Sequence, residues 1–347
     1  MKSIMDKKDY LLFETIAACT QEHLQKQLRV VLKRNYKKVV NKPGSYLFAE
    51  GDLPICLVAH MDTVFKMSPF DIYFDREKGV LWSPEGLGAD DRAGVFAILK
   101  ILQFLGKENK KKPSIIFTCN EESGCIGASQ LILDYQDSPM KLKYIIQLDR
   151  RGIDDCVFYD NDNKEFIKFI SEYGFTENWG TFSDISVICP TWGIAGVNLS
   201  VGYEDEHLEI ETLHVEHLYS TITKVYKMIL EIDNAPFFIH IENIKNYGQW
   251  WRYYPREDDD YFAADPSKCY KCGKDITDLD SIELKDTYGQ KVMCCGDCFG
   301  DLDVTWCDEC KKPFINDNKY ETECCDCQLK KWGGENTHGG FEYAGMY

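Results

Sequence analysis

Short apolar runs alternate with helical patterns between residues 54 and 232 of the chain. Four runs are apolar along almost their whole length, which is typical of strands buried on both faces. They are residues 54–59, 114–119, 143–148 and 196–201. Apolar residues recur at helical spacing in four other segments, residues 92–105, 125–135, 163–173 and 212–232. This alternation predicts an α/β fold, with a mostly parallel, mixed sheet flanked by helices.

Two segments outside this alternation also have a clear pattern. Residues 8–34 carry apolar side chains at the spacing of an amphipathic helix, so we expect a helix there. Residues 71–82 have the pattern of a hairpin, in which residues 75–79 (DREKG) form the turn.

Composition and charge limit the binding partners and the cellular location that we expect for the protein. The 347 residues are 44% hydrophobic, and 57 Asp and Glu against 40 Lys and Arg give a net charge of −17. Such a charge repels phosphate groups and argues against general nucleic-acid binding. No segment approaches the ~20 apolar residues of a membrane span, and the N-terminus lacks the apolar core of a signal peptide. We therefore expect a cytoplasmic protein without membrane contact.

The composition changes after about residue 232, where cysteine, aromatic and acidic residues become frequent. A chain of this length suggests about two domains. We expect, in chain order, a catalytic domain over residues 1–235, a docking segment and acidic linker over 236–266, a cysteine-rich domain over 267–330, and a loose glycine-rich tail over 331–347.

Polar side chains follow each of the four predicted strands. Ligands of an open α/β sheet bind beyond the carboxyl ends of its strands, so these side chains should meet at one edge. They are His60 and Asp62, Glu121 and Glu122, Asp149, and His207, joined by Asp90 at the start of a predicted helix. Imidazole and carboxylate groups suit zinc, and a carboxylate can bridge two ions ~3.5–4 Å apart. The set predicts a two-metal hydrolytic centre.

The same segments carry a resemblance to a known family. AHMDTV, GADDRAG and EESG, followed by Asp149 and the late stretch EHLEIE, resemble the co-catalytic two-zinc exopeptidases of clan MH. This group includes peptidase T, the tetrahedral aminopeptidases and related deacylases. His207 and Glu211 stand at the places of the family's closing H-x-x-x-E stretch, and the resemblance covers roughly residues 10–232. It implies a zinc-exopeptidase fold of the phosphorylase/hydrolase-like type.

The resemblance also implies a role for each matching residue. The general base and acid is Glu121, and Asp62 orients the imidazole of His60. The peptide bond after the bridging residue is often cis in the family. The implied cofactors are two zinc ions, for which cobalt or manganese could substitute. Their ligands are His60 on one metal, Asp90 bridging both, Glu122 and Asp149 on one metal each, and His207 on the second metal.

Three further candidates have more than one interpretation. Asp184, in the stretch TFSDIS, is either a contact to substrate or to a ligand, or an ordinary helix cap. Arg150 could pair with acidic ligands or bind a substrate carboxylate. His214 and His217 lie three residues apart, which fits neither the H-E-x-x-H nor the H-x-x-E-H zinc pattern and favours an ordinary helix surface.

The cysteine-rich domain contains four C-x-x-C pairs, and four thiolates make one closed tetrahedral zinc site. Two structural zinc ions are therefore predicted, with sequential pairing as the simplest arrangement and cross-braced pairing as an alternative. Cys294 and Cys325 are spare, and a one-residue shift could exchange either with its neighbour. The spacing loosely resembles zinc-ribbon or LIM modules, which could bind a protein partner. The predicted ligands are Cys269, Cys272, Cys295, Cys298, Cys307, Cys310, Cys324 and Cys327.

These observations favour a metal-dependent exopeptidase. Aminopeptidase is the first hypothesis, because the resemblance implies that Asp rather than Glu at position 149 favours this activity over that of the related carboxypeptidases and deacylases. A carboxypeptidase or N-acyl amino acid deacylase is the alternative, so the substrate is a peptide or an acylated amino acid. A zinc-finger adaptor without catalysis is the third hypothesis, which the presence of Glu121 and of every ligand disfavours. The gaps 60–90 and 149–207 are too short for the extra domain that many relatives insert, so we expect one compact catalytic domain.

Overall fold

The structure, a computed structural model, divides into two compact units, Met1–Gly248 and Gln249–Tyr347, and each is described by itself. The predicted linker beyond residue 242 and the predicted tail from residue 331 lie outside the described residues. The described residues are 5–242 and, in the cysteine-rich region, 269, 281–285, 291–295, 304–307, 309, 311 and 313–315.

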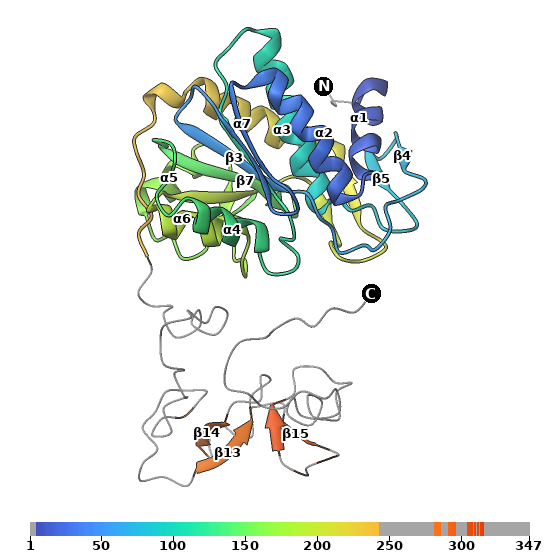
Figure 1. The fold of residues 1–347 in the computed structure, drawn as a ribbon. Coiled ribbons are helices and arrows are strands. Elements are labelled where there is room, and N and C mark those ends of the chain that lie inside the picture. The colour runs from blue at the N-terminus through green and yellow to red at the C-terminus, as the bar shows by residue number, and fades with distance from the viewer. Residues whose placement is uncertain are drawn as a thin grey trace. The chain divides into compact units, whose positions relative to one another are not determined.

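An eight-stranded mixed sheet forms the centre of the first unit (Figure 1). Its strands are β1 Lys38–Lys42, β2 Tyr46–Glu50, β3 Ile55–His60, β6 Ser114–Thr118, β7 Tyr144–Arg150, β8 Asp155–Val157, β9 Thr176–Glu177 and β10 Gly196–Ser200. They follow the order β1-β2-β6-β3-β7-β10-β8-β9, in which β6, β3, β7 and β10 run parallel. These four parallel strands are the four predicted apolar runs, so the predicted sheet is confirmed.

Helices cover both faces of this sheet. They are α1 Lys7–Ala17, α2 Gln21–Asn35, α3 Ala89–Lys107, α4 Ile126–Asp134, α5 Lys164–Ser171, α6 Asp184–Trp192 and α7 Val215–Leu230, followed by the short turn η1 Ile232–Asn234. Alternate residues of β3 enter two cores, Leu57 and Ala59 one and Cys56 and Val58 the other. Helices α1, α3 and α7 close the first core, and α4 and α6 close the second (Figure 1).

The single helix predicted over residues 8–34 is wrong, because two helices occupy this segment. The second helix begins after Thr20, whose hydroxyl accepts a hydrogen bond from the backbone N–H of His23 at 3.3 Å. Threonine at this position starts a new helix, and it interrupts an apolar pattern that otherwise continues across the break.

A smaller four-stranded sheet, with the order β11-β12-β5-β4, also belongs to the first unit. Its strands are β4 Tyr73–Asp75, β5 Val80–Trp82, β11 Tyr203–Glu204 and β12 Thr212–His214. The predicted hairpin is β4–β5, closed by a hydrogen bond from the backbone N–H of Gly79 to the carbonyl of Asp75 at 2.7 Å. The helix predicted over residues 212–232 starts only at Val215, because Leu213 pairs with Leu81 in the sheet.

The described strands of the second unit form a four-stranded sheet in the order β14-β13-β16-β15. They are β13 Ser281–Lys285, β14 Lys291–Cys295, β15 Val304–Trp306 and β16 Pro313–Ile315. The Sγ atoms of Cys269 and Cys294 are 4.0 Å apart, and the backbone N–H of Cys295 donates to Cys269 Sγ at 3.4 Å. Five predicted zinc ligands lie outside the described residues: Cys272, Cys298, Cys310, Cys324 and Cys327.

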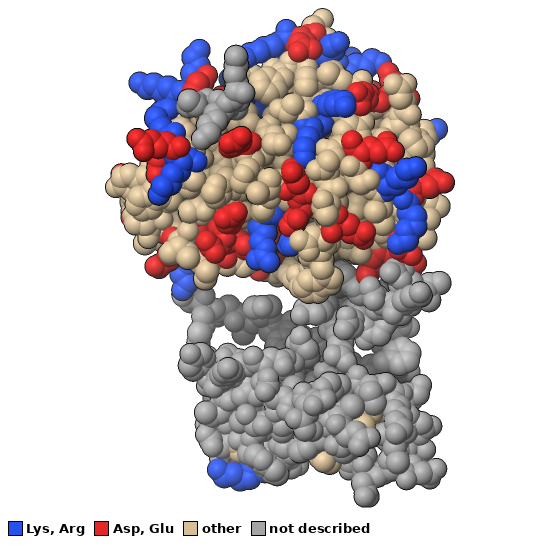
Figure 2. All heavy atoms as spheres, turned by 180° about the vertical axis from the view of Figure 1, so that it is seen from behind, with Lys and Arg blue, Asp and Glu red and all other residues tan. Residues whose placement is uncertain are grey.

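The surface of the first unit carries charges of both signs. On the face shown in Figure 2, Lys and Arg are interspersed with Asp and Glu, which differs from the continuous basic surface that phosphate backbones bind. Within the described part of the chain, none of the helices has both the length and the apolar character that a membrane span requires.

Candidate metal centre

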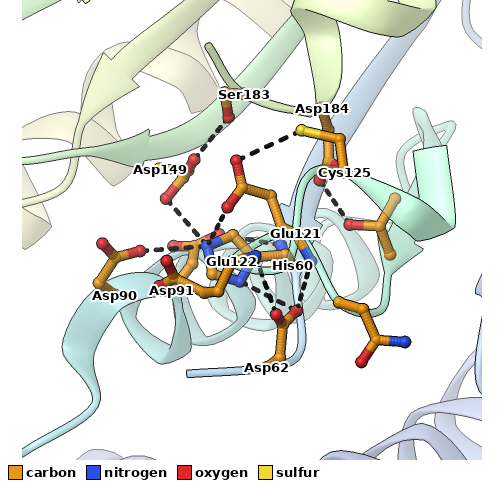
Figure 3. Close-up of polar contacts among 12 residues, drawn as sticks. His60, Asp62, Asp90, Asp91, Glu121, Glu122, Cys125, Asp149, Ser183 and Asp184 are labelled. Carbon is orange, nitrogen blue, oxygen red and sulfur yellow. Dashed lines mark hydrogen bonds and ion pairs between the residues drawn. The ribbon is translucent and has the colours of Figure 1, made fainter. Parts of the chain in front are cut away.

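The polar residues predicted from the strand ends meet at the carboxyl edge of the parallel strands (Figure 3). The parallel arrangement brings the ends of β3, β6 and β7 to this one edge, although they lie far apart in the sequence. The residues are His60 at the end of β3, Asp62 just beyond it, Glu121 and Glu122 after β6, Asp149 in β7, Asp90 at the start of α3, and His207 between β11 and β12.

His60 faces two carboxylates through one ring nitrogen. Its Nε2 atom lies 3.1 Å from Asp90 Oδ1 and 3.3 Å from Asp149 Oδ1, and the imidazole is buried. Burial by itself lowers the pKa of His60, but Asp149, Asp62 and Asp90 together raise this pKa well above its ordinary value. One imidazole nitrogen and two carboxylate oxygens form a donor set suited to a divalent metal.

Asp90 directs its other oxygen to a second group of ligands. Asp90 Oδ2 lies 3.3 Å from His207 Nε2, which is itself 3.1 Å from Glu122 Oε2. Hydrogen bonds to Asp90 and Glu122 raise the pKa of His207 to about 10. Because its two oxygens face different histidines, Asp90 has the orientation of a bridging carboxylate. The peptide bond between Asp90 and Asp91 is cis, as the resemblance implies.

Asp62 lies behind the imidazole rather than among the ligand oxygens. Its Oδ1 atom is 3.4 Å from His60 Nδ1, the ring nitrogen that does not face Asp90. Its two oxygens also accept hydrogen bonds from the backbone N–H groups of Glu121 and Glu122, both at 3.0 Å. This is the geometry of a residue that orients ligands, and it ties the loop after β6 to the end of β3.

Glu121 is buried beside the two ligand groups. Its Oε2 atom is 3.9 Å from His60 Nε2, and the thiol of Cys125 contacts its Oε1 atom at 3.6 Å. Burial raises the pKa of Glu121 well above its usual range, and Asp149 acts in the same direction against the opposing effect of His60. A carboxyl group with a raised pKa is suited to accept and return a proton near neutral pH.

Asp149 is held by side chains that sequence reasoning missed. Its Oδ2 atom accepts hydrogen bonds from Ser183 Oγ at 2.8 Å and from Gln147 Nε2 at 3.0 Å, with Asn198 Nδ2 at 3.4 Å. The hydroxyl of Tyr203 contacts the other oxygen, Oδ1, at 3.4 Å. With Oδ2 occupied by amide and hydroxyl donors, Oδ1 is the oxygen that remains directed at the imidazole and a metal.

Asp91 lies close to His60 and Asp149, and its side chain accepts hydrogen bonds from the backbone. Its Oδ2 atom accepts the backbone N–H of His60 at 3.1 Å, and its Oδ1 atom accepts that of Gly94 at 2.8 Å. Both oxygens therefore accept backbone N–H groups, although one of them lies within 4.8 Å of the ligand atoms of His60 and Asp149. A Cβ atom at Gly94 would lie 1.9 Å from the carbonyl oxygen of Leu148, so only glycine lets α3 approach β7 here.

Asp184 belongs to none of the groups of ligand-type side chains among the described residues. It is buried, and the hydroxyl of Thr118 donates to its Oδ2 atom at 2.5 Å. Burial raises the pKa of Asp184 to about 7. Since the adjacent Ser183 donates to Asp149, the start of α6 is tied both to β6 and to a predicted ligand.

The other open candidates also lie apart from the ligand groups. Arg150 donates from Nη2 to the carbonyl of Trp179 at 3.1 Å, so it supports the loop before α6. The imidazoles of His214 and His217 stack with their centroids 5.0 Å apart, and His214 Nε2 lies 3.5 Å from Glu204 Oε2. These two histidines belong to none of the groups of ligand-type side chains found among the described residues.

The donor set fits divalent cations. Three groups of ligand-type residues have donor atoms within 4.8 Å of one another, and all their members except the exposed His207 are buried or partly buried. The groups are His60, Asp91 and Asp149; His60, Glu121 and Glu122; and Asp90, Glu122 and His207. Glu122 Oε1 is buried without a hydrogen-bond partner in the structure. Burial raises the pKa of Asp149 to about 6, and the neighbouring Asp90 adds to this effect while His60 opposes it. Bound cations would remove the repulsion among these carboxylates.

The fold and the paired ligand groups define a metal-dependent hydrolase built on the exopeptidase fold. Residues 42–174 match the model of the family described as Peptidase family M28. This match indicates that the protein is a metallopeptidase, in agreement with the resemblance to the co-catalytic exopeptidases. No curated protein sequence matches the chain.

Two solved structures share the fold. A tripeptidase from Staphylococcus aureus subsp. aureus Mu50 has a TM-score of 0.57 at 17% identity, and the match covers 67% of this chain and 100% of that one. Aminopeptidase PepT from Bacillus cereus has a TM-score of 0.53 at 17% identity, with coverage of 67% and 100%. At this identity the likeness establishes the fold, and it confirms the predicted fold class of the first unit.

Proposed function

We propose that the protein is an aminopeptidase, which removes residues from the N-termini of peptides. The observation that carries the proposal is the position of Asp90, whose oxygens face His60 and His207 separately, with Glu121 buried beside them. Aspartate at position 149 favours this activity over that of a carboxypeptidase or a deacylase. Two structures with the same fold, a tripeptidase and an aminopeptidase, support the same choice.

We assign two zinc ions to the centre, with cobalt or manganese as alternatives. Asp90 would bind both ions. When bound, such a pair supplies a Lewis acid that polarises the scissile carbonyl and lowers the pKa of water. One ion would be held by His60 and Asp149 and the other by Glu122 and His207.

In the proposed reaction, Glu121 accepts a proton from the attacking water and returns it to the nitrogen of the leaving amine. The C–O bond forms, the amide C–N bond breaks, and the carboxyl group of Glu121 ends in its starting state. Its orientation is set by Cys125 at one oxygen and by Asp62, which accepts the backbone N–H of Glu121. Asp62 therefore holds the base and the imidazole of His60 in one framework.

A peptide digest with mass-spectrometric readout tests the proposal. Free peptides, N-acetylated peptides and N-acyl amino acids are incubated with the zinc-loaded or cobalt-loaded full chain. We expect stepwise loss of N-terminal residues from the free peptides alone. Loss of C-terminal residues would indicate a carboxypeptidase, and release of acyl groups a deacylase. Metal binding without cleavage of any substrate would favour the adaptor.

Replacing the base separates catalysis from metal binding. Glu121→Gln preserves size but cannot accept the proton, so we expect a loss of at least ~100-fold in kcat. Metal content should stay at the wild-type value, because the substitution leaves in place the backbone N–H that Asp62 accepts. Metal analysis and initial rates on one N-terminally free peptide measure both effects, and wild-type activity in the variant would remove Glu121 from the mechanism.

For the second unit, we propose two structural zinc ions held by its C-x-x-C cysteines, and a protein partner as its binding target. We also propose a reducing compartment, the cytoplasm, for the whole protein. All six cysteines of residues 5–242 are free thiols and buried, as expected where disulfides are rare.

A further inference from the structure

Glu211 is a buried carboxylate to which the mechanism above gives no role. Its side chain has no exposed surface, and it lies at the end of the loop between β11 and β12. Glu211 Oε2 accepts the backbone N–H of Ala89 at 2.9 Å, and Oε1 accepts the backbone N–H of Asp90 at 3.1 Å. Both oxygens are therefore engaged by the backbone, and Glu211 cannot be a metal ligand in this arrangement.

These hydrogen bonds hold an irregular turn at the start of α3. The turn follows Gly88, which has φ 65°, and the backbone angles of Asp90 (φ −82°, ψ 103°) and Asp91 (φ −116°, ψ 41°) are not helical. The carboxylate of Glu211 accepts two N–H groups of this turn from the other end of the unit's sequence. Because one of these N–H groups belongs to Asp90, Glu211 fixes the backbone of the bridging ligand itself.

The same loop also carries His207. The side chain of His207 is 50% exposed, so little packing holds it, and its backbone has φ 67°. Its Nε2 atom nevertheless lies 3.3 Å from Asp90 Oδ2. The loop that presents His207 ends at Glu211, and the backbone N–H of Glu211 donates to the carbonyl of Leu208 at 3.0 Å, which closes a tight turn.

We propose that Glu211 is the positioning residue of the second metal subsite. Its carboxylate joins the backbone of Asp90, by a hydrogen bond, to the loop that presents His207. The proposal rests on the two-metal centre proposed above. The first subsite does not depend on this link in the same way. Its other two ligands, His60 and Asp149, lie on neighbouring parallel strands, β3 and β7, so only the shared ligand Asp90 depends on this link.

Metal titration without substrate tests the proposal. The full-length wild type and Glu211→Gln are stripped of catalytic metal and titrated with zinc against a competing chelator, which resolves the tighter and the weaker binding step. In the variant, an amide NH₂ replaces one acceptor oxygen opposite a backbone N–H. We expect the second-subsite affinity to fall roughly 10–100-fold, with the other step much less affected. His207→Ala, which removes a ligand of that subsite, identifies which step is lost.

Two further variants keep the result decisive. Glu209→Gln makes the same charge change on an exposed side chain of the same loop and should bind both metals as the wild type does. If Glu211→Gln does not fold, Glu211→Asp keeps the charge, shortens the side chain by one methylene and should show the same selective loss. Unchanged affinity at both subsites, even with a lowered unfolding midpoint, would mean that Glu211 only stabilises the turn at the start of α3. Because no substrate is used, a failure of the proposed aminopeptidase activity leaves this outcome unaffected.

Discussion

His60 and Asp62 lie two positions apart and have different proposed roles. His60 binds a metal ion, and Asp62 orients the imidazole of His60. His60 presents Nε2 to the carboxylates of Asp90 and Asp149, whereas Asp62 contacts the opposite ring nitrogen. His60→Ala should therefore lose about one metal ion per chain. Asp62→Ala keeps every proposed ligand, so it should weaken metal binding by roughly 10–100-fold without abolishing it. Metal content after dialysis and chelator-competition titration measure the two effects.

An aspartate far from the centre provides the matched control for this pair. Asp137 is exposed, and Asp137→Ala removes the same carboxylate from the surface of the first unit. It should retain the metal content and affinity of the wild type. Equal metal content in His60→Ala, Asp62→Ala and the wild type would show that the stretch LVAHMDTVF contains a strand end and a turn rather than a ligand.

The sequence reveals the predicted ligands but not the side chains that hold them. His60, Asp90 and Glu121 lie in short motifs whose chemistry can be recognised locally. Asn198 reaches Asp149 only because β10 pairs with β7, whereas Gln147 lies two residues before Asp149 on the same strand. That register is a long-range property of the folded sheet, and no local spacing of residues encodes it.

Hydrogen bonds to two helices that are distant in the sequence hold α1 in place. Asp9 on α1 accepts a hydrogen bond from Lys100 Nζ on α3 at 2.7 Å and another from the hydroxyl of Tyr219 on α7. Lys100 is only 4% exposed. Asp9→Asn should destabilise the first unit by about 3 kcal/mol, because it leaves a buried ammonium without its carboxylate. Urea unfolding at saturating metal measures the change.

An exposed ion pair gives the comparison for this prediction. Lys38 Nζ and Glu50 Oε2 are 2.7 Å apart, but their side chains are 57% and 38% exposed. Glu50→Gln should therefore change the free energy of unfolding by less than about 1 kcal/mol. A similar loss in both variants would mean that Asp9 acts as an ordinary surface charge and does not anchor α1.

At the level of elements, the apolar runs identified the strands that are buried on both faces. The hairpin of β1 and β2 went unrecognised. Strand β1 lies at the edge of the sheet and is half-exposed, and the short buried run Tyr46–Ala49 of β2 was not identified as a strand. Near the N-terminus, the break before α2 lets Gln21 and Asn120 form two hydrogen bonds, at 2.9 and 3.1 Å. This contact links α2 to the loop that carries Glu121, and it depends on tertiary structure rather than on helical periodicity.

Over the whole molecule, the two units differ in what can stabilise them. The first contains two cores formed by helices on opposite faces of one sheet. In the described part of the second, the buried residues are Leu284 and four cysteines, Cys269, Cys294, Cys295 and Cys307. Bound metal can supply folding free energy to so small a segment. We therefore expect the second unit, unlike the first, to unfold when zinc is removed.

The ligands of that zinc can be tested at two adjacent positions. In a tetrahedral site with Zn–S bonds of about 2.3 Å, thiolate sulfurs lie ~3.8 Å apart. The 4.0 Å between the Sγ atoms of Cys269 and Cys294 is close to this spacing. We therefore predict a one-residue shift, in which Cys294 rather than Cys295 is the ligand. Cys294→Ser should lower the zinc content of the full chain by about one ion and weaken the thiolate charge-transfer band of the cobalt form. Cys295→Ser, the matched control, should retain both, and the reverse result would return the site to Cys295.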